Sequence, residues 1–232
     1  IVDQLKLSVE KLGSRLNFAL EKTEGLMQDI RGLSVVREAL QEASASASGV
    51  GESAEEVAGI VVDGDYVVFI VDTSGSMKTI WNVVVNQLEK LILIHPHLSG
   101  FQILNDNGSH LIPGYSGRWI PDTEGLRKSS IKLLRTWNSV SNSSPVEGLE
   151  VALKRYAKPN KRLSIYIFGD DYTGSSYDAV INAVTRLNIR RSGKERLTRV
   201  HAVGFLTDPT NTRFATLMRE VTRRSNGTFL AL

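Results

Sequence analysis

The sequence contains no cysteine among its 232 residues. Disulfide bonds, thiolate metal sites and cysteine nucleophiles are therefore excluded. The compartment stays open, because cytosolic proteins and bacterial envelope proteins both tolerate this absence. No apolar run approaches the roughly 20 residues that a membrane-spanning helix needs, so we expect no transmembrane segment in this chain. The first residue is Ile1, with neither an initiating Met nor a signal-peptide pattern, and we expect the chain to be a piece of a longer protein.

Several motifs of enzymes and nucleotide-binding proteins are missing as well. The sequence has no Walker loop, no G-x-G-x-x-G and no nucleophile elbow. Its net charge is +3, but residues 1–64 hold 11 acids and 6 bases, whereas residues 65–232 hold 14 acids and 22 bases. Such a basic part could attract acidic proteins, anionic lipid or nucleic acid. The interleaved aromatic and basic residues of nucleic-acid modules are not visible, so we expect no nucleic-acid partner.

The first part of the chain has apolar residues, with one threonine, at steps of three and four. These positions are Val2, Leu5, Val9, Leu12, Leu16, Ala19, Thr23, Leu26, Ile30 and Leu33. The pattern predicts a helix with a heptad seam, which either associates with another helix or packs on the rest of the chain. Residues 43–53 read ASASASGVGES and have too little apolar surface to order themselves. We therefore expect a helical stalk or coiled-coil segment over residues 1–42, a flexible linker over 43–59 and a globular domain over 60–232.

The stretch over residues 67–77 reads VVFIVDTSGSM. Its first five residues are apolar without alternation, which is typical of a strand covered on both faces of a parallel sheet. Asp72, Ser74 and Ser76 follow at every second position, so in an extended loop their oxygens project toward one side. A carboxylate and two hydroxyls, with no cysteine or histidine nearby, favour Mg²⁺, Mn²⁺ or Ca²⁺ over zinc.

Further apolar strands are predicted over residues 163–168 and 200–205, and helical patterns separate the strands. This alternation predicts an α/β fold with a doubly wound, mostly parallel sheet covered by helices on both faces. Asn107-Gly108 indicates a tight hairpin between residues 100–104 and 109–112, so we expect one antiparallel strand at a sheet edge. Ligands of such sheets lie outside the carboxyl ends of the strands.

The residues DTSGSM after an apolar strand resemble the D-x-S-x-S signature of the von Willebrand factor type A domain. The order of elements over residues 60–232 is also similar to that family. The resemblance implies a Rossmann-like fold with a metal-ion-dependent adhesion site (MIDAS). In the family, hydroxyls touch the ion, the carboxylates act mostly through water, and one coordination position stays open.

The resemblance implies ligands in two further loops. In the family a Thr ahead of a Pro and a helix supplies another hydroxyl, and Ser144 occupies that place in SSPVEGLEVAL. The neighbouring Ser141 and Ser143 are alternatives for the same role. An acid of the third loop aligns with Asp170, and Asp171 stands where the family has Gly. The implied metal ligands are therefore Asp72, Ser74, Ser76, Ser144 and Asp170.

The function that follows is divalent-cation-dependent protein binding, for adhesion or complex assembly and without catalysis. A bound Mg²⁺ (or Mn²⁺ or Ca²⁺) would recruit an Asp or Glu of a protein partner. One alternative is a structural assembly module with a vestigial metal site, in which Ser and Asp serve as ordinary helix N-caps. A haloacid-dehalogenase-like phosphatase is a weaker alternative, because its general acid would have to stand at the position of Ser74.

The predicted stalk also bears on location. A heptad segment ahead of a linker resembles membrane-tethered envelope proteins that carry this type of domain. We therefore expect an extracytoplasmic or cell-envelope location, with a cytoplasmic one as the alternative.

Overall fold

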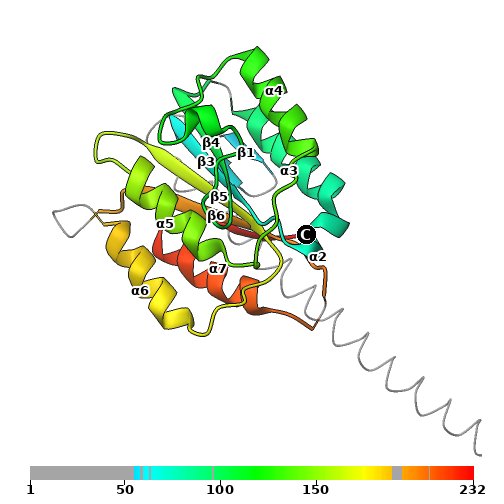
Figure 1. Ribbon diagram of the computed structural model, residues 1–232. Coiled ribbons are helices and arrows are strands. Elements are labelled where there is room, and N and C mark those ends of the chain that lie inside the picture. Colours follow the sequence, from blue (N-terminus) through cyan, green and yellow to red (C-terminus); the bar gives the residue numbers. More distant parts are fainter. Residues whose placement is uncertain (1–54, 58–59, 63, 96, 190–194, 209) are drawn as a thin grey trace, which may run out of the picture. The chain divides into compact units, whose positions relative to one another are not determined.

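The computed structural model describes residues 55–57, 60–62, 64–95, 97–189, 195–208 and 210–232 (Figure 1). They belong to one compact unit, Ala54–Leu232. No helix among these residues is long and apolar enough to cross a membrane. The predicted stalk over residues 1–42, its self-association and most of the linker lie outside the described residues. The described end of that linker is a strand, β1 (Glu55–Val57), which pairs antiparallel with β2 (Ile60–Val62).

The other elements alternate between strands and helices along the chain. The remaining strands are β3 (Tyr66–Val71), β4 (Gly100–Asn105), β5 (Leu163–Gly169), β6 (Thr198–Gly204) and β7 (Phe229–Ala231). The helices are α2 (Gly75–Thr79), α3 (Trp81–Ile94), α4 (Glu124–Arg135), α5 (Pro145–Tyr156), α6 (Tyr177–Leu187) and α7 (Arg213–Arg224), with a 3₁₀ turn at Pro113–Tyr115.

The main sheet has the strand order β4-β3-β5-β6-β7, and all its pairings are parallel. The chain moves from β3 to β4 on one side and then returns to β5 on the other side of β3. This reversal makes the boundary of β3 and β5 a topological switch point, where the crevice for a ligand opens at the carboxyl ends of the strands. The predicted doubly wound α/β fold is confirmed.

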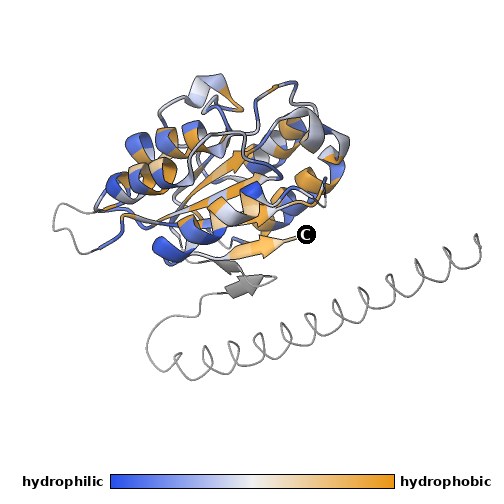
Figure 2. Ribbon diagram, turned by 90° about the horizontal axis from the view of Figure 1, so that it is seen from below, coloured by the Kyte–Doolittle hydropathy of each residue, from blue (hydrophilic) through white to orange (hydrophobic). Residues whose placement is uncertain are grey.

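Helices cover both faces of this sheet, with α3 and α4 on one face and α5, α6 and α7 on the other (Figure 1). The strands are predominantly hydrophobic, whereas the helices mix hydrophobic and hydrophilic residues (Figure 2). Alternate residues of β3 serve the two layers, since Val67 and Phe69 pack with the first and Val68 and Ile70 with the second. The central strand is therefore buried from both sides, as its unbroken apolar run predicts.

The predicted antiparallel edge strand over residues 109–112 is not found. The tight turn itself forms, since Gly108 has φ +84° and its N–H donates to the carbonyl of Asn105 at 2.9 Å. Two isolated antiparallel bridges stand in place of the strand, Leu104 with His110 and Phe101 with Ile120. The chain turns into the 3₁₀ helix at Pro113, which has no N–H to continue a ladder.

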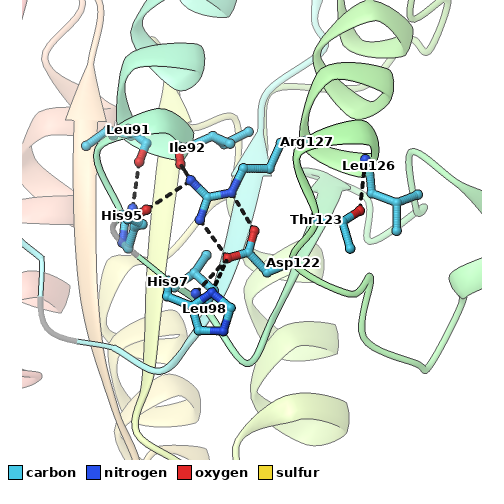
Figure 3. A network of polar contacts seen from close by, with 9 residues as sticks. All are labelled: Leu91, Ile92, His95, His97, Leu98, Asp122, Thr123, Leu126 and Arg127. Atoms are coloured by element: carbon cyan, nitrogen blue, oxygen red, sulfur yellow. Dashed lines mark hydrogen bonds and ion pairs between the residues drawn. The ribbon is translucent and has the colours of Figure 1, made fainter.

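Arg127 joins the end of α3 to the start of α4 (Figure 3). Its guanidinium donates to the carbonyls of Ile92 and His95 at 2.7 and 2.9 Å, and to Asp122 Oδ2 at 2.7 Å. Asp122 Oδ2 also accepts from the backbone N–H of Leu98 at 2.7 Å. Carbonyls at a helix end lack partners within the helix, so Arg127 satisfies them and holds Asp122 in place.

Replacing Arg127 by Met should destabilise the domain by about 3 kcal/mol, because the buried carboxylate of Asp122 loses its guanidinium partner and keeps only the N–H of Leu98 and the exposed ring of His97. The Asp122 side chain is 5% exposed and that of Arg127 12%, so water cannot replace the lost partner fully. Urea unfolding followed by circular dichroism measures the change.

Lys128→Met is the matched control, because Lys128 and Glu124 form an ion pair on the same helix with side chains 72% and 82% exposed. This variant should leave the free energy of unfolding almost unchanged, because water screens an exposed ion pair. Equal effects of the two variants would show that the Arg127 contacts do not stabilise the fold.

Candidate metal site

Asp72 lies directly after β3, at the switch point of the sheet. Its backbone N–H donates to the carbonyl of Phe168 on the neighbouring strand at 2.8 Å, and the residue is only 1% exposed. One carboxylate oxygen, Oδ1, accepts from the N–H of Ser74 at 2.7 Å. The other, Oδ2, is buried and has no hydrogen-bond partner among the described residues. An acceptor in that state needs a proton or a cation nearby.

Ser74 ends the loop after β3, and Ser76 lies in the first turn of α2, so the extended conformation predicted for this stretch ends at Ser74. The hydroxyl oxygens of the two side chains lie 3.1 Å apart. Ser74 stands at the N-cap of α2, yet its side chain makes no capping hydrogen bond to that helix. The two hydroxyls therefore lie together after the carboxyl end of β3, where Asp72 also lies.

Asp170 follows β5 and is 6% exposed. Its Oδ2 accepts from the hydroxyl of Thr207 at 2.5 Å, whereas Oδ1 is buried without a hydrogen-bond partner in the described part of the chain. The next residue, Asp171, turns its carboxylate to its own loop, where Oδ1 accepts from the N–H of Tyr172 at 2.5 Å. The two adjacent acids thus differ, and only Asp170 has a free acceptor buried at the sheet edge.

The serines of the loop before α5 contact different partners. The predicted ligand Ser144 donates its hydroxyl to Glu147 Oε2 at 2.8 Å, in the first turn of its own helix. Ser141 instead donates to Asp72 Oδ1 at 3.4 Å and accepts from the N–H of Thr73 at 3.2 Å. Ser143 is buried with φ +56°, and this unusual backbone conformation turns the loop between them. The hydroxyl brought to Asp72 is therefore that of Ser141.

A further carboxylate that the sequence reasoning missed, Asp106, lies beside Asp72. It follows β4, whose last residue Asn105 is paired in register with Val71. Its Oδ1 accepts from the N–H of Thr73 at 3.2 Å, and its Oδ2 accepts from the N–H of Ser144 at 3.3 Å. Asp106 thus connects the loop after β3 to the start of α5. Its only signal in the sequence is its place at the end of a strand neighbouring β3.

Close packing holds α5 against this edge. The N–H of Gly148 donates to the carbonyl of Asp106 at 2.6 Å. A Cβ at Gly148 would lie 2.7 Å from the carbonyl oxygen of Asn105 and 2.9 Å from that of Asp106. Only glycine allows the helix to come this near, and the approach fixes the serine loop that precedes α5.

Burial and neighbouring carboxylates raise the proton affinity of Asp72. Burial is the main cause that raises the pKa of Asp72 to about 7, and the nearby charges of Asp106 and Asp170 raise it further. The pKa of Asp106 is also raised, chiefly by burial. A divalent cation here would relieve both the desolvation and the repulsion.

The donor chemistry at the edge fits a hard divalent cation. Among the described residues, no group of three or more His, Cys, Asp or Glu side chains is arranged to hold a metal ion. The candidate set instead consists of two carboxylates and several hydroxyls, all with oxygen donors. Asp72 and Asp170 each have one buried carboxylate oxygen without a hydrogen-bond partner among the described residues. A cation bound between them would satisfy both oxygens.

No protein-family model matches the sequence, and a search of curated proteins finds no match. Similar solved structures do exist. A von Willebrand factor type A protein from Catenulispora acidiphila has a TM-score of 0.58 at 14% identity, with 75% of this chain and 40% of that chain covered.

Proximal thread matrix protein 1 from the mussel byssus is similar in two structures, one of them with a zinc-occupied MIDAS motif. Its TM-score is 0.50 at 11% identity, with 72% of this chain and 41% of that chain covered. The match thus covers about two fifths of the length of each of these two proteins. The likeness in fold agrees with the sheet order and with the resemblance in the sequence. The described part of the chain has the fold of von Willebrand factor type A domains.

Proposed function

We propose that this domain is a divalent-cation-dependent protein-binding module in which a bound Mg²⁺, Mn²⁺ or Ca²⁺ recruits an Asp or Glu of a partner. The observation that carries the proposal is the pair of buried, partnerless carboxylate oxygens, Asp72 Oδ2 and Asp170 Oδ1, at the switch point. A closed structural site would leave no such acceptors unsatisfied. The fold adds support, because ligands of doubly wound sheets lie at this edge.

The proposed ligands are Asp72, Ser74, Ser76 and Asp170, together with one hydroxyl of the serine loop. We propose Ser141 for that hydroxyl, since it already contacts Asp72, whereas the hydroxyl of Ser144 is held by Glu147. Thr207 orients Asp170 by donating to its Oδ2, and the N–H of Ser74 orients Asp72 in the same way. The protein groups therefore hold the carboxylates in fixed positions ahead of binding.

The bound cation would supply an electropositive point at the surface for the carboxylate of the partner. The second candidate is an assembly module whose metal site is vestigial. The hydrogen bond between the Ser74 and Ser76 hydroxyls is the observation that favours it, because one hydroxyl donates to the other without a metal ion. Association through residues 1–42 and an extracytoplasmic location stay predictions.

Asp72→Ala should abolish binding of Mg²⁺ and Mn²⁺, because it removes a buried acceptor and one of the two carboxylates among the proposed ligands. Isothermal titration calorimetry and the metal-induced shift in Tm measure this loss. Asp171→Ala is the control, since this neighbouring acid faces its own loop and its removal should leave metal affinity within about twofold. A normal Tm shift in Asp72→Ala would contradict the proposed site.

The two serines of the loop before α5 give a sharper test. Ser141→Ala should weaken Mg²⁺ affinity by about tenfold, a change typical of groups that hold or orient metal ligands. Ser144→Ala should leave the affinity unchanged and lower stability by less than the roughly 1 kcal/mol typical of an N-cap, because the Ser144 side chain makes no capping hydrogen bond to α5. The reverse pattern would assign the hydroxyl ligand to Ser144.

Without metal, stability should fall as the pH rises from about 4 to about 7. The folded state keeps a proton on Asp72, whose pKa is raised from 3.8 to about 7, whereas the unfolded chain releases it at its ordinary pKa. Chemical unfolding in EDTA at a series of pH values measures the slope, which Asp72→Asn should flatten. Mg²⁺ should restore stability most at the upper end, where no proton competes with it. A pH-independent free energy of unfolding in EDTA would show that Asp72 is not protonated in the folded state.

A further inference from the structure

A groove of about 1080 Å³ lies at the other edge of the sheet, where β5 and β6 begin. Its walls come from the turn before β5, the start of β6, the end of α7 and Gly64 ahead of β3. Six cationic side chains line it: Lys161, Arg162, Arg196, Arg199, Arg223 and Arg224. Glu195 is the one acid among the described residues of the lining.

Helix polarity explains part of this charge. Arg223 and Arg224 stand in the last turn of α7, where cations offset the helix dipole, and both pair with Glu220. Arg162 pairs with Asp65 through two hydrogen bonds, at 2.6 and 3.0 Å. Lys161, Arg196 and Arg199 stand on no helix, so dipole compensation does not account for them.

Arg196 lines both this groove and a small adjoining cavity of about 10 Å³, which it shares with Asn188, Arg224 and Ser225. Its Nη1 is buried and has no hydrogen-bond partner among the described residues. A cavity of this size has room for about one water molecule, which would satisfy the buried donor. Arg196 therefore contributes to the groove through its positive charge.

We propose that this basic groove binds an acidic polypeptide segment of a partner protein. The guanidinium groups of Arg162 and Arg223 already hold carboxylates bidentately, which is the recognition chemistry proposed for the partner. Among the described residues that line the groove there is no aromatic side chain, and hence no stacking platform of the kind found in single-stranded nucleic-acid sites. Its concave shape also differs from the apolar convex surface that inserts into a lipid interface.

The groove is independent of the metal site. The metal-site acids Asp72 and Asp170 follow the ends of β3 and β5, whereas the groove residues Arg162 and Arg199 stand at the starts of β5 and β6. Since these strands are parallel, the metal site lies at their carboxyl ends and the groove at their amino ends. One domain is thereby able to hold two partners, one through a cation and one through direct ion pairs.

The test uses the full chain in EDTA, so that the metal site does not contribute. A fluorescein-labelled peptide of alternating Glu and Ser is titrated by fluorescence anisotropy, beside the same peptide with Gln for Glu. The Glu peptide should bind, more weakly as salt is raised, and the Gln peptide should not. Lys161→Glu combined with Arg199→Glu should reduce the affinity by about tenfold or more.

Controls separate the groove from general charge and from misfolding. Lys90→Glu combined with Lys132→Glu makes the same change in net charge on exposed helix positions and should keep the affinity within about twofold. Lys161→Gln combined with Arg199→Gln is a milder pair whose loss should be smaller, and circular dichroism checks each fold. Equal losses in the groove and control pairs, or binding of single-stranded RNA or anionic vesicles in place of the Glu peptide, would overturn the proposal. The Glu peptide should also bind the Asp72→Ala variant, which would show that the groove binds it independently of the metal site.

Discussion

The burial of the Asp72 carboxylate at the switch point is the constraint on which the rest of this edge depends. The parallel strands β4, β3 and β5 end side by side, and an acid follows each of them: Asp106, Asp72 and Asp170. The fold therefore brings the three carboxylates together although their charges repel. Each charge is desolvated, and their mutual repulsion raises the cost. The fold tolerates this cost because backbone N–H groups and hydroxyls of adjacent loops hold all but two of the carboxylate oxygens.

The way these contacts are shared explains why three distant loops keep one geometry. Asp106 accepts from the loop after β3 and from the start of α5, and Gly148 lets that helix approach its carbonyl. The Thr173 N–H then donates to the carbonyl of Ser143 at 3.1 Å and connects the serine loop to the loop after β5. A shift in one loop would therefore break contacts with the other two, which makes the site rigid before any ligand binds.

Much of this site is visible in the sequence, and the remainder depends on backbone conformation. Asp72, Ser74 and Asp170 could be predicted because each follows an unbroken apolar strand or continues the alternation that begins there. Asp106 was missed, because N-D-N-G reads as a turn and the pairing of β4 beside β3 is a property of the whole sheet. The choice between the loop serines depends on the positive φ of Ser143, which no local pattern predicts for a residue other than glycine. The prediction of an antiparallel edge strand was wrong for a related reason, because β propensity does not reveal where a 3₁₀ turn begins.

Helix dipoles favour negative charge at the carboxyl ends of the strands and positive charge at their amino ends. Helices α2 and α5 begin at the metal-site edge, where their N-terminal N–H groups favour carboxylates such as Asp106. At the opposite edge α7 ends, and its carbonyls favour Arg223 and Arg224. A doubly wound domain therefore tends to separate its acids and bases along the strand direction. Arg196 and Arg199 line the same edge without belonging to α7, so helix polarity accounts for only part of the positive charge there.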